Sequence, residues 1–150
     1  MNRVLTILVV MYFLGLTGCA GRYNVGGSYV GQLPKGGISA IAEDATAHLS
    51  SLYPPGRTSI RLVAPNKQTD EFTQKLETSL RQKGFTLSPN GTVTMSYVLD
   101  ELRSAKPPVW YLQLRIADKT QSKTIARSYT DNGQPVAGFS NLSTGGESND

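Results

Sequence analysis

The residue with the clearest chemistry in this sequence is Cys19, the only cysteine of the 150-residue chain. It ends the tetrapeptide Leu16-Thr17-Gly18-Cys19, which has the pattern of a bacterial lipobox. In the lipoprotein pathway the cysteine thiol forms a thioether with diacylglycerol. A signal peptidase, which needs small residues such as Gly18, then cleaves the chain before the cysteine. The motif therefore predicts a covalent diacylglycerol and N-acyl lipid on Cys19, and no other cofactor.

The segment ahead of Cys19 supports this interpretation. Arg3 supplies a positive charge, and an apolar run from Val4 to Leu16 follows it, which is the order of a secretory signal peptide. As a helix this run would be about 20 Å long, too short for a hydrocarbon core of about 30 Å. An uncleaved membrane anchor is therefore the weaker alternative. We expect removal of residues 1–18, which leaves 132 of the 150 residues.

Other side chains that could do chemistry are sparse. His48 is the only histidine, and it precedes a core-facing leucine in an expected helix, so we interpret it as a surface or boundary residue. Three pairs of adjacent carboxylates occur: Glu43-Asp44, Asp70-Glu71 and Asp100-Glu101. The first two stand at expected helix starts, where carboxylates are favoured by the helix dipole. The third stands at a strand end, where its two side chains leave in different directions. The sequence predicts no catalytic residue and no metal site, although a carboxylate pair drawn from separate elements stays open.

The charge pattern indicates what kind of partner to expect. The formal charge is +4 and the pI about 9.3, but the basic side chains are scattered singly among acidic ones. Because no run of five or more like charges occurs, we expect a solvated surface and no direct binding of nucleic acid. The length suits one domain with flexible ends.

The chain after the signal peptide divides into a tether, a domain and a tail. Residues 19–37 are rich in glycine and lack an apolar period. They predict a lipidated tether that would hold the domain about 20–25 Å from the acyl chains. Tyr23 and Tyr29 are unusual in a spacer and are candidate partner-contact residues; a plain spacer is the alternative. Residues 131–150 consist largely of Gly, Ser, Asn and Thr, a composition that predicts a disordered tail.

Residues 38–130 carry the patterns of a folded domain. Helical spacing of apolar residues predicts a helix over 38–53 and a second one that ends before Gly84. We expect Ser39 and Thr69 to cap the amino ends of these two helices.

Alternating apolar residues predict the strands. The clearest alternation begins at Trp110 and runs through Leu112 and Leu114 to Ile116, and a shorter strand fits residues 58–64. The loop Pro89-Asn90-Gly91 predicts a hairpin with a three-residue turn. This loop would pair Leu87 with Val93 and Phe85 with Met95.

The last predicted strand, residues 123–130, alternates only weakly. Either Ile125 and Tyr129 or Ala126 and Ser128 face inward. The order of helix, strand, helix and then four strands predicts an α+β fold. We expect a two-layer sandwich in which two helices pack on one face of a mostly antiparallel sheet of about five strands, forming a periplasmic domain over 38–130.

Several stretches together carry a family resemblance: the lipobox, Leu49–Pro55 followed by Arg57-Thr58, Phe72–Phe85, and Trp110–Leu114. Their order resembles that of the TrbH family of conjugal transfer lipoproteins. The resemblance covers about residues 19–130 and leaves out the tail. It implies a structural, non-enzymatic part of the mating-pair-formation apparatus, a type IV secretion system that moves plasmid DNA between bacteria. Its partners would be other envelope proteins of that apparatus, and Cys19 alone carries over as a functional residue.

The residue after the lipobox indicates which membrane would hold the protein. Asp after the lipidated cysteine commonly retains a lipoprotein in the inner membrane, and this chain has Ala20 instead. We therefore expect a lipid-anchored protein in the inner leaflet of the outer membrane, facing the periplasm. The alternative is a free-standing envelope lipoprotein that binds a lipid or cell-wall ligand in a groove between helices and sheet. That groove would be lined by Phe72, Leu76, Trp110 and Leu112.

Overall fold

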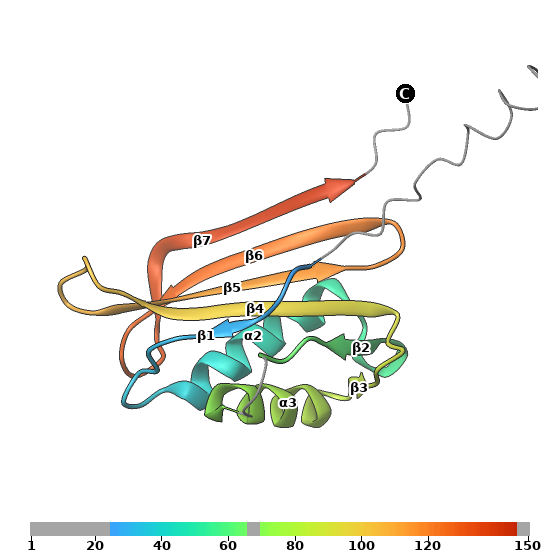
Figure 1. Cartoon of the computed structure of the whole chain (residues 1–150), viewed down its shortest axis with the longest axis horizontal. Helices are drawn as coiled ribbons and strands as arrows, with labels where there is room; N and C mark the ends of the chain where they lie inside the picture. Colours follow the sequence, from blue (N-terminus) through green and yellow to red (C-terminus); the bar gives the residue numbers. More distant parts are fainter. Residues whose placement is uncertain (1–24, 66–69, 147–150) are drawn as a thin grey trace, which may run out of the picture.

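The computed structural model describes residues 25–65 and 70–146 (Figure 1). The expected signal peptide, the lipobox with Cys19, and Tyr23 lie outside these residues. The elements in chain order are β1 (Tyr29–Val30), α2 (Ile38–Leu52), a 3-10 turn (Pro55–Arg57), β2 (Ser59–Leu62), α3 (Glu71–Lys83), β3 (Thr86–Leu87), β4 (Val93–Leu102), β5 (Val109–Ala117), β6 (Gln121–Tyr129) and β7 (Pro135–Gly146).

The strands form one mixed sheet of seven strands, in the order β3-β2-β4-β5-β6-β7, with β1 also on β4. The long strands β4 to β7 pair antiparallel, whereas β1, β2 and β3 pair parallel to their neighbours. The α+β prediction is therefore confirmed. The sheet has more than five strands because β1 and β7 join it at the two ends of the domain, and it is mixed because β1, β2 and β3 pair in parallel.

Both helices lie on the same side of the sheet, as Figure 1 shows. Leu49 of α2 and Phe72 of α3 are almost fully buried, opposite Tyr97 of β4 and Leu114 of β5. The rings of Phe72 and Tyr97 meet edge to face, 5.4 Å apart. Each such side chain contributes about 1.5–3 kcal/mol by leaving water, so this single apolar layer holds the helices on the sheet.

The helices have the predicted extents but different caps. Gly37 precedes α2 with a positive φ of 71°, and no side chain caps that end, so the expected Ser39 cap is wrong. The carboxylate of Asp70 caps α3 by accepting a hydrogen bond from the N–H of Thr73 at 2.8 Å. Asp70 thus takes the role assigned to Thr69, because its carboxylate reaches the free N–H groups of the first turn.

The expected hairpin around residues 89–91 is wrong. Leu87 pairs with Ile60 of β2, and Ile60 pairs in turn with Val93, so β2 separates β3 from β4. The connecting chain passes directly over β2. A Cβ added to Gly91 would lie 2.3 Å from the backbone nitrogen of Arg61. Gly91 is therefore needed for close approach of two backbones.

The carboxyl-terminal part of the chain also differs from expectation. Ile125 and Tyr129 face the core, which resolves that open choice, although Ser128 is also buried. Residues 135–146, expected to belong to a disordered tail, form β7 and pair with β6. Strand pairing needs backbone groups and not an apolar pattern, so the composition of this segment gave a misleading signal.

Candidate functional site

The segment from Val25 to Leu33, hereafter the docked segment, belongs to the region expected to be a free tether. Val25 is 6% exposed, and its carbonyl accepts a hydrogen bond from the hydroxyl of Ser96 at 2.6 Å. Tyr29 and Val30 then pair with Val98 and Leu99 of β4. The tether expected over 19–37 is therefore shorter, because its second half is part of the domain.

Ser28 joins this segment to two strands at once. Its hydroxyl donates to the carbonyl of Val63, just after β2, and accepts from the N–H of Tyr97 at 2.9 Å. Tyr97 lies on β4 between the part that pairs with β2 and the part that pairs with β1. The serine side chain thus fills the gap between two short parallel strands at one edge of β4.

Further contacts fix the rest of the docked segment. The N–H of Gly31 donates to the carbonyl of Leu99 at 2.8 Å, and the N–H of Gln32 donates to Asp100 at 2.9 Å. The indole N–H of Trp110 donates to the carbonyl of Gln32 at 3.1 Å. Asp100, half of a carboxylate pair in the sequence, therefore binds backbone N–H groups.

Tyr29 is the exposed side chain of this segment. Its exposed fraction is 55%, whereas the neighbouring Val30 packs against the core. A tyrosine held on a paired strand has a fixed position, which suits a contact surface better than a free spacer would. The role of Tyr29 in partner contact stays a prediction.

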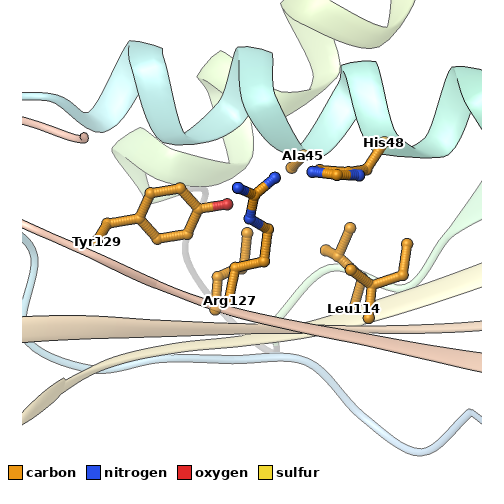
Figure 2. Close-up of a pocket in the computed structure, with 7 residues that line it drawn as sticks. Ala45, His48, Leu114, Arg127 and Tyr129 are labelled. Atoms are coloured by element: carbon orange, nitrogen blue, oxygen red, sulfur yellow. The ribbon is translucent and has the colours of Figure 1, made fainter. Parts of the chain in front are cut away.

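A second group of polar residues lies between α2 and β6. The Tyr129 hydroxyl donates to a carboxylate oxygen of Asp44 at 2.7 Å, and the Arg127 guanidinium lies 3.2 Å from the same carboxylate. Figure 2 shows Arg127 and Tyr129 rising from the sheet toward α2, with the His48 ring to the right of the Arg127 guanidinium. Burial raises the pKa of Tyr129 above its usual value, and the hydrogen bond to Asp44 adds to this rise.

The geometry of this group indicates a structural role. His48 lies 3.9 Å from Asp44, and its side chain is 37% exposed, in agreement with its interpretation as a surface or boundary residue. The adjoining pocket is lined by Ala45, His48, Leu112, Leu114, Ile125, Arg127 and Tyr129, and has no volume for a water molecule. Because substrate has no room there, the ion pair serves to tie α2 to β6.

A third cluster surrounds Asp118, at the turn between β5 and β6. Burial opposes ionisation of this carboxyl, but hydrogen bonds from the N–H and hydroxyl of Thr120 and the hydroxyl of Tyr53 outweigh it, and the pKa falls to about 2. Burial also raises the pKa of Tyr53 above its usual value, and the hydrogen bond to Asp118 adds to the rise. The Lys123 ammonium lies 5.3 Å from the Tyr53 ring centre. These contacts join the end of α2 to the sheet.

The groove required by the ligand-binding alternative is occupied by the protein itself. The side chains expected to line it lie in the core cluster with exposed fractions of 6% or less: Phe72, Leu76, Trp110 and Leu112. Over residues 25–65 and 70–146, no group of three His, Cys, Asp or Glu side chains has the arrangement of a metal site. Nor do the described residues include a helix of the length and apolarity needed to span a bilayer.

The family comparison agrees with the resemblance seen in the sequence. The sequence model of the family described as "Conjugal transfer protein TrbH" matches residues 23–147, most of the chain. The chain belongs to the TrbH family. Comparisons with curated proteins and with solved structures give no match. Membership in TrbH makes this a conjugal transfer protein and points to other transfer proteins and the cell envelope as its surroundings. The match also extends beyond residue 130, so the docked segment and β7 both lie within the family region.

Sequence reasoning missed both the docked segment and the α2–β6 ion pair. Arg127 and Asp44 stand far apart in the chain, so no spacing could have joined them. The docked segment did carry a signal, since Val25, Val30 and Leu33 are apolar residues in a glycine-rich stretch. Their role was hidden because they are held through backbone pairing and one serine.

Proposed function

We propose that this TrbH-family protein is a lipid-anchored structural component of the conjugative type IV secretion apparatus. The family match over residues 23–147 supports this proposal most directly. The lipobox ending at Cys19 supplies the anchor, and the position of Ala20 favours the inner leaflet of the outer membrane. The chain would act by binding other envelope proteins of the apparatus, without catalysis.

Two features of the structure support a scaffolding role over a catalytic one. The polar groups between helix and sheet are paired with one another, as in the contacts of Asp44 with Arg127 and Tyr129. The pocket beside them is closed. A small rigid domain close to its anchor is suited to holding partners in position at the membrane.

Plasmid transfer measures this proposal directly. Deletion of the gene should lower the frequency of plasmid transfer to recipient cells, and the wild-type gene supplied in trans should restore it. The native protein, purified by an affinity tag from donor cells, should bring with it other transfer proteins. Undiminished transfer after deletion would refute the proposed function, and sedimentation with inner-membrane markers would refute the outer-membrane location alone.

A further inference from the structure

Among residues 25–65 and 70–146, both helices lie on one face of the sheet, and the other face has no helix over it. Register places Val98 of β4, Gln113 of β5 and Ala126 of β6 in one row across this face, with Arg115 and Thr124 in the next row. These rows alternate with the buried residues that face the helices, because successive side chains of a strand point to opposite sides. We call this surface the open face.

The docked segment adds an aromatic residue to the open face. Tyr29 pairs with Val98, and its neighbour Val30 packs against the core, so the two side chains point to opposite sides of the sheet. Tyr29 therefore lies on the open face beside Val98. Tyr111, partly buried on β5, belongs to the same face because its neighbours Trp110 and Leu112 face the helices.

The chain leaves the domain on this face. Ser96, which alternates away from the core, binds the carbonyl of Val25, and a Cβ on Gly26 would lie 3.2 Å from the guanidinium of Arg115. Figure 1 shows this blue segment crossing β4 before it reaches the position of β1. Val25, the first described residue, therefore lies on the open face.

The link from Val25 to the lipid is short. Only five residues separate Cys19 from Val25, and the six Cα–Cα steps span at most about 20 Å at 3.3–3.6 Å per step. To turn the helix side toward the bilayer, the link would have to pass around a sheet covered by helices that are themselves about 10–12 Å thick. A link of this length therefore favours contact of the open face with the membrane surface.

We propose that the open face lies on the phospholipid headgroups of the bilayer that holds the acyl chains of Cys19. This inference rests on the proposed lipid anchor. Tyr29 and Tyr111 have the amphipathic rings that are enriched at membrane interfaces. Arg115 donates through Nε and Nη2 to the side chain of Gln113, and its positive charge would attract lipid phosphate. Asp100, an acidic residue on the same side of β4 as Val98, already accepts hydrogen bonds from the backbone N–H groups of Gln32 and Glu101. The helices then face away from the membrane, toward protein partners.

The test compares two fluorescent probes on the full-length lipidated protein. Thr124→Cys places a thiol on the open face, and Gln82→Cys places one on the exposed side of α3; each is labelled with the same fluorophore. The proteins are reconstituted into vesicles of phosphatidylethanolamine and phosphatidylglycerol that carry a nitroxide on a fraction of the headgroups. We expect quenching to be several-fold stronger at position 124 than at position 82. Equal quenching, or stronger quenching at position 82, would overturn the proposal.

Two controls separate the ways in which this test can fail. Thermal unfolding checks that both variants are folded. If Thr124→Cys does not fold, Asn141→Cys replaces it, because Asn141 of β7 continues the row of Val98 and Gln113. The mass of the mature protein reports the lipid. An unlipidated Cys19 would overturn the anchor and the membrane-facing surface together, whereas a lipidated chain with equal quenching would overturn only the surface.

Discussion

Asp44 is the residue on which the contact between α2 and β6 depends. Its carboxylate accepts a hydrogen bond from the Tyr129 hydroxyl and forms an ion pair with Arg127, whose side chain is only 19% exposed. Removing one partner of a shielded ion pair leaves the other charge without compensation. Asp44→Asn should therefore lower the free energy of unfolding by about 1–3 kcal/mol, as measured by urea denaturation.

Glu43→Gln is the matched control for this variant, because Glu43 is the adjacent acidic residue and is exposed. It should change stability by less than about 0.5 kcal/mol. Asp44→Asn should also lower the pKa of Tyr129 relative to wild type, since the hydrogen bond to Asp44 contributes to its rise. Equal stabilities of the two variants would show that the ion pair contributes nothing.

Asp118 makes stability depend on pH in the acid range. The pKa of its carboxyl is lowered from 3.8 to about 2 in the folded chain. A depressed folded pKa stabilises the protein fully above the unfolded value, and this contribution is lost as pH falls through the folded value. Asp118→Asn should therefore be less stable than wild type at pH 7, and the difference should shrink between about pH 4 and pH 2. Thermal unfolding across this range is the measurement, and a difference that stays constant with pH would contradict the assignment.

Among the elements, the docked segment is joined to β2 and β4 by one serine hydroxyl, in addition to its pairing with β4. Ser28 satisfies the N–H of Tyr97 and the carbonyl of Val63. Loss of this hydroxyl would leave the shielded Tyr97 N–H without an acceptor, at a cost of about 1–3 kcal/mol. Ser28→Ala should lower stability by this amount and speed hydrogen exchange at Gly31, whose N–H bonds to β4. The exposed Ser104, replaced by alanine, is the control and should leave Gly31 exchange unchanged.

The crossing of β2 by the chain depends on Gly91. A methyl group there would meet the backbone of Ile60 and Arg61 at 2.4 and 2.3 Å, so the two segments would have to move apart. Gly91→Ala should destabilise the domain by at least about 1–3 kcal/mol, the typical cost of overpacking. Gly56→Ala is the control, because an added Cβ has no atom within 4 Å there. If both variants unfold at the same denaturant concentration, the close approach is not a constraint.

These elements show what the sequence could predict. The stripe of α3 and the alternation of β5 are local patterns, and both elements form where they were expected. The insertion of β2 between β3 and β4 is a non-local choice, because a short strand can pair on either side of its neighbour. β7 and the docked segment are held by backbone hydrogen bonds at sheet edges, so their side chains need no regular pattern. Their composition therefore wrongly predicted a disordered tail and a free tether.

At the scale of the whole molecule, the proposed anchor at Cys19 and the folded domain are expected to act as separate units. Cys19 lies outside every described helix and strand. In Cys19→Ser a hydroxyl replaces the thiol, and it does not accept the diacylglyceryl group. The precursor should therefore escape the lipoprotein peptidase, keep residues 1–18 or be cut elsewhere, and lose its acyl anchor.

The domain itself should be unaffected by this change, because the core and the strand pairs described for residues 25–65 and 70–146 are complete without Cys19. Cys19→Ser should thus retain near-normal thermal stability while membrane sorting fails and plasmid transfer falls. Metabolic labelling with a palmitate analogue is the direct measurement, with the wild-type chain as reference. Equal label on both proteins would refute the lipoprotein assignment. It would also remove the basis for placing the open face on the bilayer, since that placement follows from the short link of five residues between Cys19 and Val25.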